Sequence, residues 1–251
     1  PQLKPLVAIR LLTIIAISHG WQKQPNASSV QEKMEQAFSL LLATPIELMG
    51  AGRTDAGVHA KKMVAHFDTE LGFDKQIIKD RLNAFLAADI SIDQILAVTQ
   101  ETHARFTATS RTYEYIVVNQ KDPFQHHGAH YVFQPLDIQS MNKAAQMLLG
   151  EKDFECFSKS NSDVHTFICD ITHAKWVATK GQLVFTITAN RFLRNMVRAI
   201  VGTLLEIGTG KRPVTDIPLL LETKSRSKAG PSVPAKGLYL TQINYPENIY
   251  V

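Results

Sequence analysis

The most informative stretch of this sequence of 251 residues is Gly50-Ala51-Gly52-Arg53-Thr54-Asp55-Ala56-Gly57-Val58-His59-Ala60. Three glycines within eight residues allow positive φ angles and a close approach to a ligand or a neighbouring segment. The turn that they frame presents Arg53 and Asp55. It lacks the Lys-Ser/Thr pair of a P-loop, so it is not a phosphate cradle of that kind. These residues alone fit a tight turn closed by a local Arg–Asp ion pair, or a functional loop.

The residues on either side of this turn predict strands and helices in alternation. A helix is expected to begin at Ser28-Ser29, whose side chains can cap backbone amides, and to end before Pro45, which has no amide hydrogen. A second helix is expected over Ile77–Ala88. The short apolar run Ile46–Met49 leads into the glycine-rich turn, and strands are expected at Val7–Ile17, Met63–Phe67 and Ile90–Val98.

The second part of the chain repeats this pattern without a visible sequence repeat. A strand beginning at Arg111 is expected to carry Tyr113, Tyr115 and Val117 on one face. Helices are expected from Asp137 through Leu149 and, long and amphipathic, over Phe192–Ile207. Further strands are expected at Ile168–Val177, Leu183–Thr188 and Leu238–Ile243, the first two separated by Lys180-Gly181. We therefore expect an α+β protein of two similar α/β domains, residues 1–105 and 106–251.

The composition is that of an ordinary globular protein, with 45% hydrophobic and 20% charged residues. The longest apolar run, Leu11–Ile17, is far too short to cross a bilayer, and the start of the chain favours a first strand over a signal peptide. Cys156 and Cys169 cannot form a disulfide framework, so a reducing, cytoplasmic compartment is expected. Neither the cysteines nor the pair His126-His127 has metal-ligand spacing, and no metal is expected.

The net charge of +4 is distributed unevenly. Residues 1–110 carry 11 basic and 11 acidic residues, whereas residues 111–251 carry 16 and 12. Within the second part, Arg191–Lys236 holds nine basic residues against three acidic ones. This segment is the candidate surface for a polyanion, with a solvated charged face as the alternative.

Five ordered blocks of the chain resemble the TruA family of tRNA pseudouridine synthases. The glycine-rich run resembles the family's catalytic motif, and the other blocks follow it in the family's order. The blocks are Gly50–His59, His103–Tyr115, Asp153–Asn161, Phe192–Gly202 and Ala229–Leu240. One departure stands before them: family members have a Tyr-Asp-Gly-Thr turn shortly before Gly20-Trp21-Gln22, where this chain has Ile15-Ala16-Ile17-Ser18-His19. Either the turn is absent or the sequence lacks several residues of the natural chain.

The resemblance implies a cofactor-free isomerase that converts uridine to pseudouridine. It assigns Asp55 as the nucleophile, which attacks either C1′ of the ribose or C6 of the uracil. It makes Arg198 the ion-pair partner of Asp55, where the alternative from the residues alone is a phosphate contact. Tyr113 would stack on the uracil and is a possible base for its C5 proton, whereas most strand tyrosines only pair with a neighbouring aromatic ring.

The remaining implied site residues bind the substrate. Arg53 would hold the extruded nucleotide, because a uridine in a base-paired stem must leave its stack before it reacts. Leu238 would form an apolar wall of the uracil pocket. Arg105 and Arg111, which lie in the second block, are also expected to bind the RNA.

The implied fold is two ferredoxin-like α/β units that form one continuous mixed, largely antiparallel sheet flanked by helices, with the catalytic cleft between the units. The implied partner is the tRNA anticodon arm, modified at uridines 38, 39 and 40, and the implied assembly is a homodimer. Two alternatives stay open: a non-catalytic RNA-binding protein on the same fold, and a pseudouridine synthase that acts on another RNA site.

Overall fold

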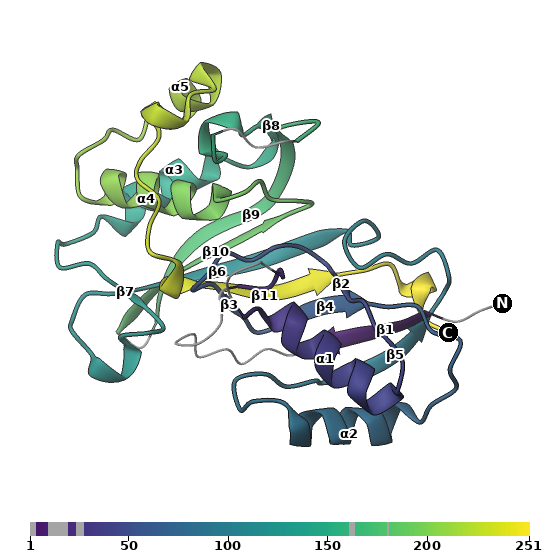
Figure 1. Ribbon diagram of the computed structural model, residues 1–251. Coiled ribbons are helices and arrows are strands. Elements are labelled where there is room, and N and C mark those ends of the chain that lie inside the picture. Colours follow the sequence, from purple (N-terminus) through teal and green to yellow (C-terminus); the bar gives the residue numbers. More distant parts are fainter. Residues whose placement is uncertain (1–3, 10–19, 24–27, 161–163, 180) are drawn as a thin grey trace. The chain divides into compact units, whose positions relative to one another are not determined.

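The computed structural model describes residues 4–9, 20–23, 28–160, 164–179 and 181–251 (Figure 1). The expectations for Leu11–Ile17, for the segment that departs from the family turn, for Asn161 and for Lys180 lie outside these residues. The chain divides into two compact units, Pro1–Thr109 with Leu240–Val251, and Ser110–Tyr239. The division falls just beyond the boundary expected at residue 105, and the last residues group with the first unit.

The first unit contains a four-stranded sheet in the order β2-β4-β1-β5, in which every pair of neighbours is antiparallel. The first strand in the chain therefore lies inside the sheet, between the third and the last of these strands. A strand is predicted at Met63–Phe67, and β4 forms there. The elements are β1 (Lys4–Ile9), α1 (Val30–Leu42), β2 (Met49–Gly50), β3 (His59–Ala60), β4 (Met63–His66), α2 (Lys75–Phe85), β5 (Gln94–Val98) and the short helix Glu247–Ile249.

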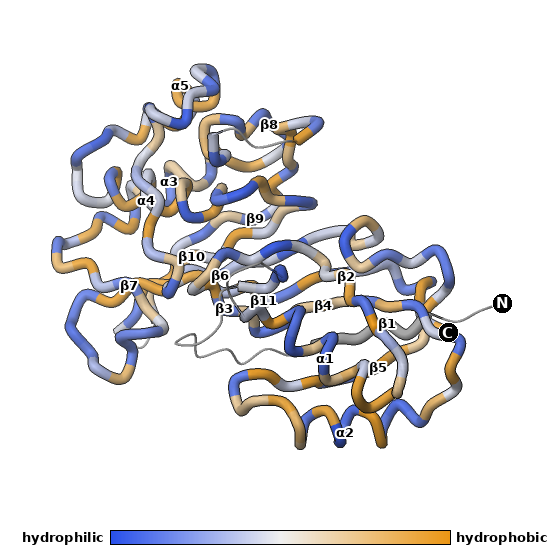
Figure 2. The backbone as a smooth tube through the Cα atoms, in the orientation of Figure 1, coloured by the Kyte–Doolittle hydropathy of each residue, from blue (hydrophilic) through white to orange (hydrophobic). Residues whose placement is uncertain are grey.

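Side-chain caps set the starts of both helices of this unit. The Ser29 side chain accepts a hydrogen bond from the Glu32 amide, which confirms the predicted start of α1. Asp74 accepts from two amides of the first turn of α2, so that helix begins two residues before Ile77. Ile78 and Leu82 are the buried residues of α2, and Figure 2 shows this helix as a mixture of apolar and polar positions. A helix of this kind covers a core on one face only.

The strand predicted over Ile90–Val98 is shorter than expected. β5 begins at Gln94, because the Asn83 side chain accepts from the Ile92 amide and donates to the Ile92 carbonyl. These two bonds, of 2.7 and 2.9 Å, occupy the backbone groups that a strand would offer to a neighbour.

The second unit contains a mixed sheet flanked by helices. β6, β10, β9 and β8 lie in this order with antiparallel neighbours, and β7 runs parallel to β6. The Asn142 side chain of α3 bonds both backbone groups of Trp176, which anchors α3 on β9. The elements are β6 (Ser110–Val118), β7 (His130–Tyr131), α3 (Ile138–Gln146), β8 (Gly150–Asp153), β9 (Ile168–Thr179), β10 (Gln182–Ala189), α4 (Met196–Gly208) and α5 (Asp216–Thr223), with short helices at Pro123–Gln125, Glu155–Phe157, Arg226–Lys228 and Ala235–Gly237. The last strand, β11 (Leu238–Asn244), begins in this unit, and its residues from Leu240 onward group with the first unit.

The predicted α+β class and the mixed sheet flanked by helices are confirmed. Among the described residues the hydrogen-bonded strands form two sheets, in place of the one continuous sheet that the resemblance implies. Asp137 caps α3 as predicted, through the Ser140 amide, but the helix ends at Gln146, and Gly150, with φ of +87°, begins β8. The helix α5 was not predicted.

The prediction of a long amphipathic helix over Phe192–Ile207 is wrong in its start and in its character. α4 begins at Met196, because Asn195 adopts a left-handed conformation with φ of +67°. Eleven of its residues are buried, so it is a central helix and not a surface one.

A close backbone contact holds the segment after α5 against α4. Gly202 faces the carbonyl of Pro231, and a Cβ at Gly202 would overlap that oxygen. The neighbouring residues are also bonded, because the amide of Gly230, before Pro231, donates to the hydroxyl of Thr203, after Gly202, at 2.9 Å. Only a residue without a side chain permits this approach at position 202.

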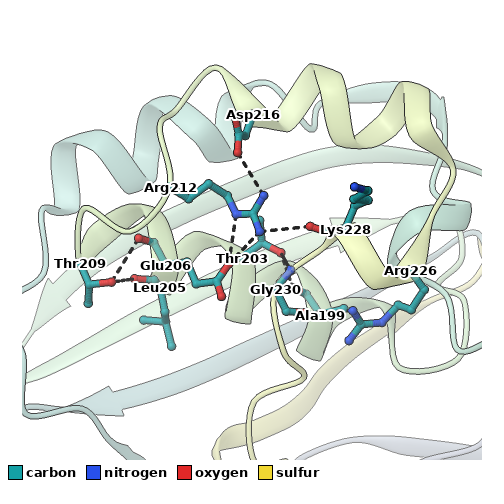
Figure 3. A network of polar contacts seen from close by, with 10 residues as sticks. All are labelled: Ala199, Thr203, Leu205, Glu206, Thr209, Arg212, Asp216, Arg226, Lys228 and Gly230. Atoms are coloured by element: carbon teal, nitrogen blue, oxygen red, sulfur yellow. Dashed lines mark hydrogen bonds and ion pairs between the residues drawn. The ribbon is translucent and has the colours of Figure 1, made fainter.

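Arg212 joins three elements near the far end of α4 (Figure 3). Its guanidinium donates to Glu206 at the end of α4, to Asp216 at the start of α5 and to the backbone carbonyl of Lys228, each at 3.1 Å. The Arg212 side chain is 19% exposed. This basic residue therefore stabilises the unit and is not available to a polyanion.

We expect Gly202→Ala to lower the free energy of unfolding by about 1–3 kcal/mol, because the new methyl group must displace the Pro231 carbonyl. Elsewhere in a helix the same change stabilises by about 0.8–1 kcal/mol. Urea denaturation followed by circular dichroism measures the difference. Gly72→Ala is the control, because a Cβ there meets no atom within 4 Å. An unchanged or raised stability of Gly202→Ala would contradict the close contact.

Candidate active site

The Asp55 loop leaves the edge of the first sheet in an ordered conformation. The Ala51 amide donates to the Val64 carbonyl at 2.8 Å, which continues the pairing of β2 with β4 by one residue. The Val58 amide donates to the Asp55 carbonyl, closing a turn in which Gly57 has φ of +83°. The Asp55 side chain is half-buried at this turn, and the preceding Arg53 is exposed. The loop thus presents a carboxylate and a cation from a fixed backbone.

The backbone of Gly20 supports this loop from behind. A Cβ at Gly20 would lie 2.5 Å from the Thr54 carbonyl oxygen, and Gly20 itself has φ of +88°. Trp21, which is 3% exposed, lies over Gly50 so closely that no side chain fits there. The amides of the first turn of α1 bond the carbonyls of Gly20 and Trp21. The helix, the Gly20-Trp21 segment and the Asp55 loop therefore form one packed support.

Tyr113 lies in the middle of the second sheet. It is paired with Ile187 of β10, and its ring meets the ring of Phe192 edge to face at 5.2 Å. The side chain is half-buried. This aromatic contact is the structural role expected of a strand tyrosine, and it also fixes the plane of the ring.

Arg198 lies in the first turn of α4 and is tied to Val233 twice. Its Nε donates to the Val233 carbonyl at 2.8 Å, and the Val233 amide donates to the Arg198 carbonyl at 3.2 Å. The next residue, Pro234, accepts a hydrogen bond from the Tyr115 hydroxyl at 2.8 Å. Burial raises the pKa of Tyr115 by more than the nearby charge of Arg198 lowers it. Tyr115 is thus a neutral, buried neighbour of Arg198.

The other expected site residues differ in their surroundings. Leu238, the first residue of β11, is 5% exposed, and the preceding Gly237 packs against the Tyr115 ring. The guanidinium of Arg111 donates to the Asn190 carbonyl at 2.9 Å. Arg105 is exposed, with its guanidinium carbon 5.6 Å from the centre of the Phe106 ring.

The structure therefore groups the sequence-predicted residues into two sets. Arg53 and Asp55 share one loop of the first unit, whereas Tyr113 and Arg198 belong to the second unit, where Arg198 lies near Tyr115. The pairing of Asp55 with Arg198 stays a prediction. Sequence reasoning missed Tyr115 and Val233 as neighbours of Arg198, although both lie in or next to blocks that carry the resemblance.

Much of the basic segment Arg191–Lys236 makes contacts within its own unit. Besides Arg198 and Arg212, Arg226 donates to Gly230 and Ser232, and Lys236 donates to the His126 carbonyl. The Lys224 ammonium lies 2.6 Å from the Asp153 carboxylate. The excess of positive charge therefore overstates the surface available to a polyanion.

The part of the chain that the structure describes holds no group of three or more His, Cys, Asp or Glu side chains able to bind a metal ion. None of its helices is long and apolar enough to span a bilayer.

Comparisons with known proteins cover most of the chain. The family model described as tRNA pseudouridine synthase matches residues 144–246. A protein of Bacteroides thetaiotaomicron named tRNA pseudouridine synthase A is 50% identical over 235 residues, which are 92% of this chain and 87% of that protein. Proteins of the same name from Parabacteroides distasonis and Porphyromonas gingivalis are each 48% identical, over 92% of this chain and 92% and 94% of their own lengths.

The raised pKa of Tyr115 predicts a specific loss of stability at alkaline pH. Below the unfolded-state pKa of about 10, both states hold the phenol proton. Above it, unfolding releases that proton, so the free energy of unfolding falls, by about 1.4 kcal/mol at pH 11. Tyr115→Phe loses the bond to Pro234, worth about 1 kcal/mol, but has no such pH dependence.

Urea denaturation at pH 8 and pH 11 tests this expectation. The wild-type chain should be more stable than Tyr115→Phe at pH 8, and this difference in the free energy of unfolding should vanish or reverse at pH 11. An equal difference at both pH values would mean that the Tyr115 hydroxyl ionises as readily in the folded state as in the unfolded chain.

Proposed function

The chain belongs to the family of tRNA pseudouridine synthase A, isomerases that act on tRNA, and from this membership we propose that it modifies uridines 38, 39 and 40 of the anticodon arm with Asp55 as the nucleophile. The observation that carries the proposal is the 50% identity to a relative of that name over 92% of the chain. The rigid support of the Asp55 loop by Gly20 favours a role for Asp55 that needs a fixed position.

The reaction breaks one bond to C1′ of the ribose and forms another. The bond from N1 of uracil to C1′ breaks, the base turns, C5 bonds to C1′, and the C5 proton leaves while N1 gains a proton. Atoms and electrons balance without an oxidant or a group donor. The carboxylate of Asp55 would form the covalent intermediate, at C1′ or at C6, that keeps the detached base or sugar in the site.

Tyr113 and Arg198 supply the two supporting roles of this proposal. Tyr113, held by the Phe192 ring, would stack on the uracil and accept the C5 proton. Arg198 would pair with the Asp55 carboxylate, because opposite charges a few ångströms apart attract each other. Leu238 would form the apolar wall of the uracil pocket, and its burial fits that role.

The strand order supports two ferredoxin-like units. In the first unit the chain order β1, α1, β2, β4, α2, β5 with the sheet order β2-β4-β1-β5 is that of a split β-α-β arrangement. In the second unit β6, β10 and β9 follow the corresponding order around α3. We propose that the residues of the two units meet at a catalytic cleft between them, in a cytoplasmic homodimer.

Binding of the RNA is assigned to basic side chains, most of them exposed. Arg53 would hold the extruded nucleotide, and Arg105 and Arg111 would contact the backbone near it. Arg194, Lys211 and Lys228 are exposed on the second unit and suit contacts with the phosphates of an A-form stem.

We expect Asp55→Asn to abolish pseudouridine formation on a full-length tRNA while the dissociation constant stays within about threefold, because the change removes only the nucleophile. Product formation is measured by tritium release from labelled uridine, and affinity by filter binding. Asp93→Asn, an exposed carboxylate of the same unit, is the control and should keep full activity. Pseudouridine formed by Asp55→Asn would remove Asp55 as nucleophile. A wild-type chain that binds tRNA but forms no product would identify a binding protein.

Binding through phosphates predicts a steep dependence on salt. Activity at subsaturating tRNA should fall with added potassium chloride, with a slope of about −0.9 per phosphate contact in the plot of log affinity against log salt. Replacing Lys211 or Lys228 by Gln should reduce the slope by about 1 for each lost contact. A response that stays flat would exclude these side chains from the RNA surface.

A further inference from the structure

Arg226 lies in the short helix Arg226–Lys228 and donates to the segment that follows it. Its Nη1 donates to the Gly230 carbonyl at 3.0 Å, and its Nη2 donates to the Ser232 hydroxyl at 2.8 Å. The same hydroxyl accepts from the Asn195 side chain at 2.6 Å. Two side chains, one after α5 and one directly before α4, therefore converge on Ser232.

The residue after Ser232 is Val233, which bonds Arg198, the side chain proposed to pair with Asp55. Val233 exchanges two hydrogen bonds with Arg198, one with its backbone and one with its Nε. A guanidinium is planar, so a bond at Nε fixes the direction in which its two Nη groups donate. A shift of Val233 would rotate this plane away from a carboxylate placed to receive both groups.

We propose that Arg226 is a positioning residue for Arg198, which holds the Arg198 guanidinium in its reactive orientation through Ser232 and Val233. The inference rests on the proposed function of Arg198 and extends it. It replaces the expectation that Arg226 belongs to the RNA-binding charges of the basic segment, because both terminal nitrogens of Arg226 donate within the unit.

The segment does not depend on Arg226 for its attachment to α4. Just before residues 232 and 233, two contacts hold the segment on α4. They are the contact of Pro231 with Gly202 and the hydrogen bond from the Gly230 amide to the Thr203 hydroxyl. The bond from the Tyr115 hydroxyl to Pro234 holds it on the other side. Loss of Arg226 should therefore loosen residues 232 and 233 without unfolding the unit.

The experiment compares Arg226→Gln with Lys175→Gln in the full-length chain. Lys175 is an exposed residue of β9 in the same unit and carries the same charge. The single-turnover rate at saturating tRNA and the dissociation constant at two salt concentrations are measured for both. We expect Arg226→Gln to lower the saturating rate by about tenfold or more, because a misplacement of about 1 Å can cost about a hundredfold, with the dissociation constant little changed. Lys175→Gln should leave the saturating rate unchanged.

Ser232→Ala provides a second, uncharged test that also covers a failure of Arg226→Gln to fold. It removes the acceptor shared by Arg226 and Asn195 and should lower the saturating rate in the same direction. On an Arg198→Lys background, Arg226→Gln should have an effect of no more than about twofold, because the positioned group is already lost.

Three results would overturn the inference. The first is an Arg226→Gln chain with an unchanged saturating rate and weaker, less salt-dependent binding, which would make Arg226 a phosphate contact. The second is an equal loss of rate on the wild-type and the Arg198→Lys backgrounds, which would indicate a general structural effect. The third is a full saturating rate of Ser232→Ala. Each result leaves the proposed function standing, which fails if Asp55→Asn remains active or if the wild-type chain binds tRNA but forms no product.

Discussion

The close contact between α4 and the segment Gly230–Val233 is the constraint on which the second unit depends. α4 is buried on nearly every side, so each residue next to it must fit within fixed limits of volume. At Gly202 and Gly230 the two backbones touch, and this sets the register of the segment along the helix. The paired bonds of Val233 with Arg198 form only in that register. The glycines at positions 202 and 230 thus permit the backbone contact that positions the Arg198 side chain.

In the first unit, glycines also permit close packing, here around the Asp55 loop. Gly20 lies against the backbone of Thr54–Ala56, and Gly50 lies under the indole of Trp21. Both glycines adopt their places because a neighbouring atom occupies the space of a Cβ. Within the glycine-rich run, Gly50 permits this tight packing and Gly57 permits the positive φ of the turn, whereas a Cβ at Gly52 would meet no atom within 4 Å. The packing at Gly20 and Gly50 helps to hold the Asp55 loop in place.

The sequence predicted the positions of most elements but not their contacts. Alternation and caps located β6, β9 and β10 and the starts of α1 and α3, because those signals are local. The start of α4 was misplaced, because Asn195 is left-handed and its side chain bonds Ser232, 37 residues further along the chain, which no local pattern indicates. Similarly, Arg212 and Arg226 looked like surface charges, because the carbonyls that they bond come from residues brought near by folding. The candidate catalytic residues followed from the resemblance and not from periodicity.

The surroundings of Arg198 explain why a carboxylate suits it as a partner. Its neighbours Val233 and Tyr115 satisfy hydrogen bonds or occupy space, but neither carries a charge. Burial keeps the Tyr115 phenol protonated, so its oxygen cannot become a phenolate that neutralises the guanidinium. Carbonyl dipoles stabilise a half-buried cation without cancelling its charge. The bonds with Val233 fix the orientation of the Arg198 guanidinium, and an oriented guanidinium suits a carboxylate, which can accept hydrogen bonds from two of its nitrogens. A nucleophilic carboxylate needs this environment, because only its ionised form can attack carbon.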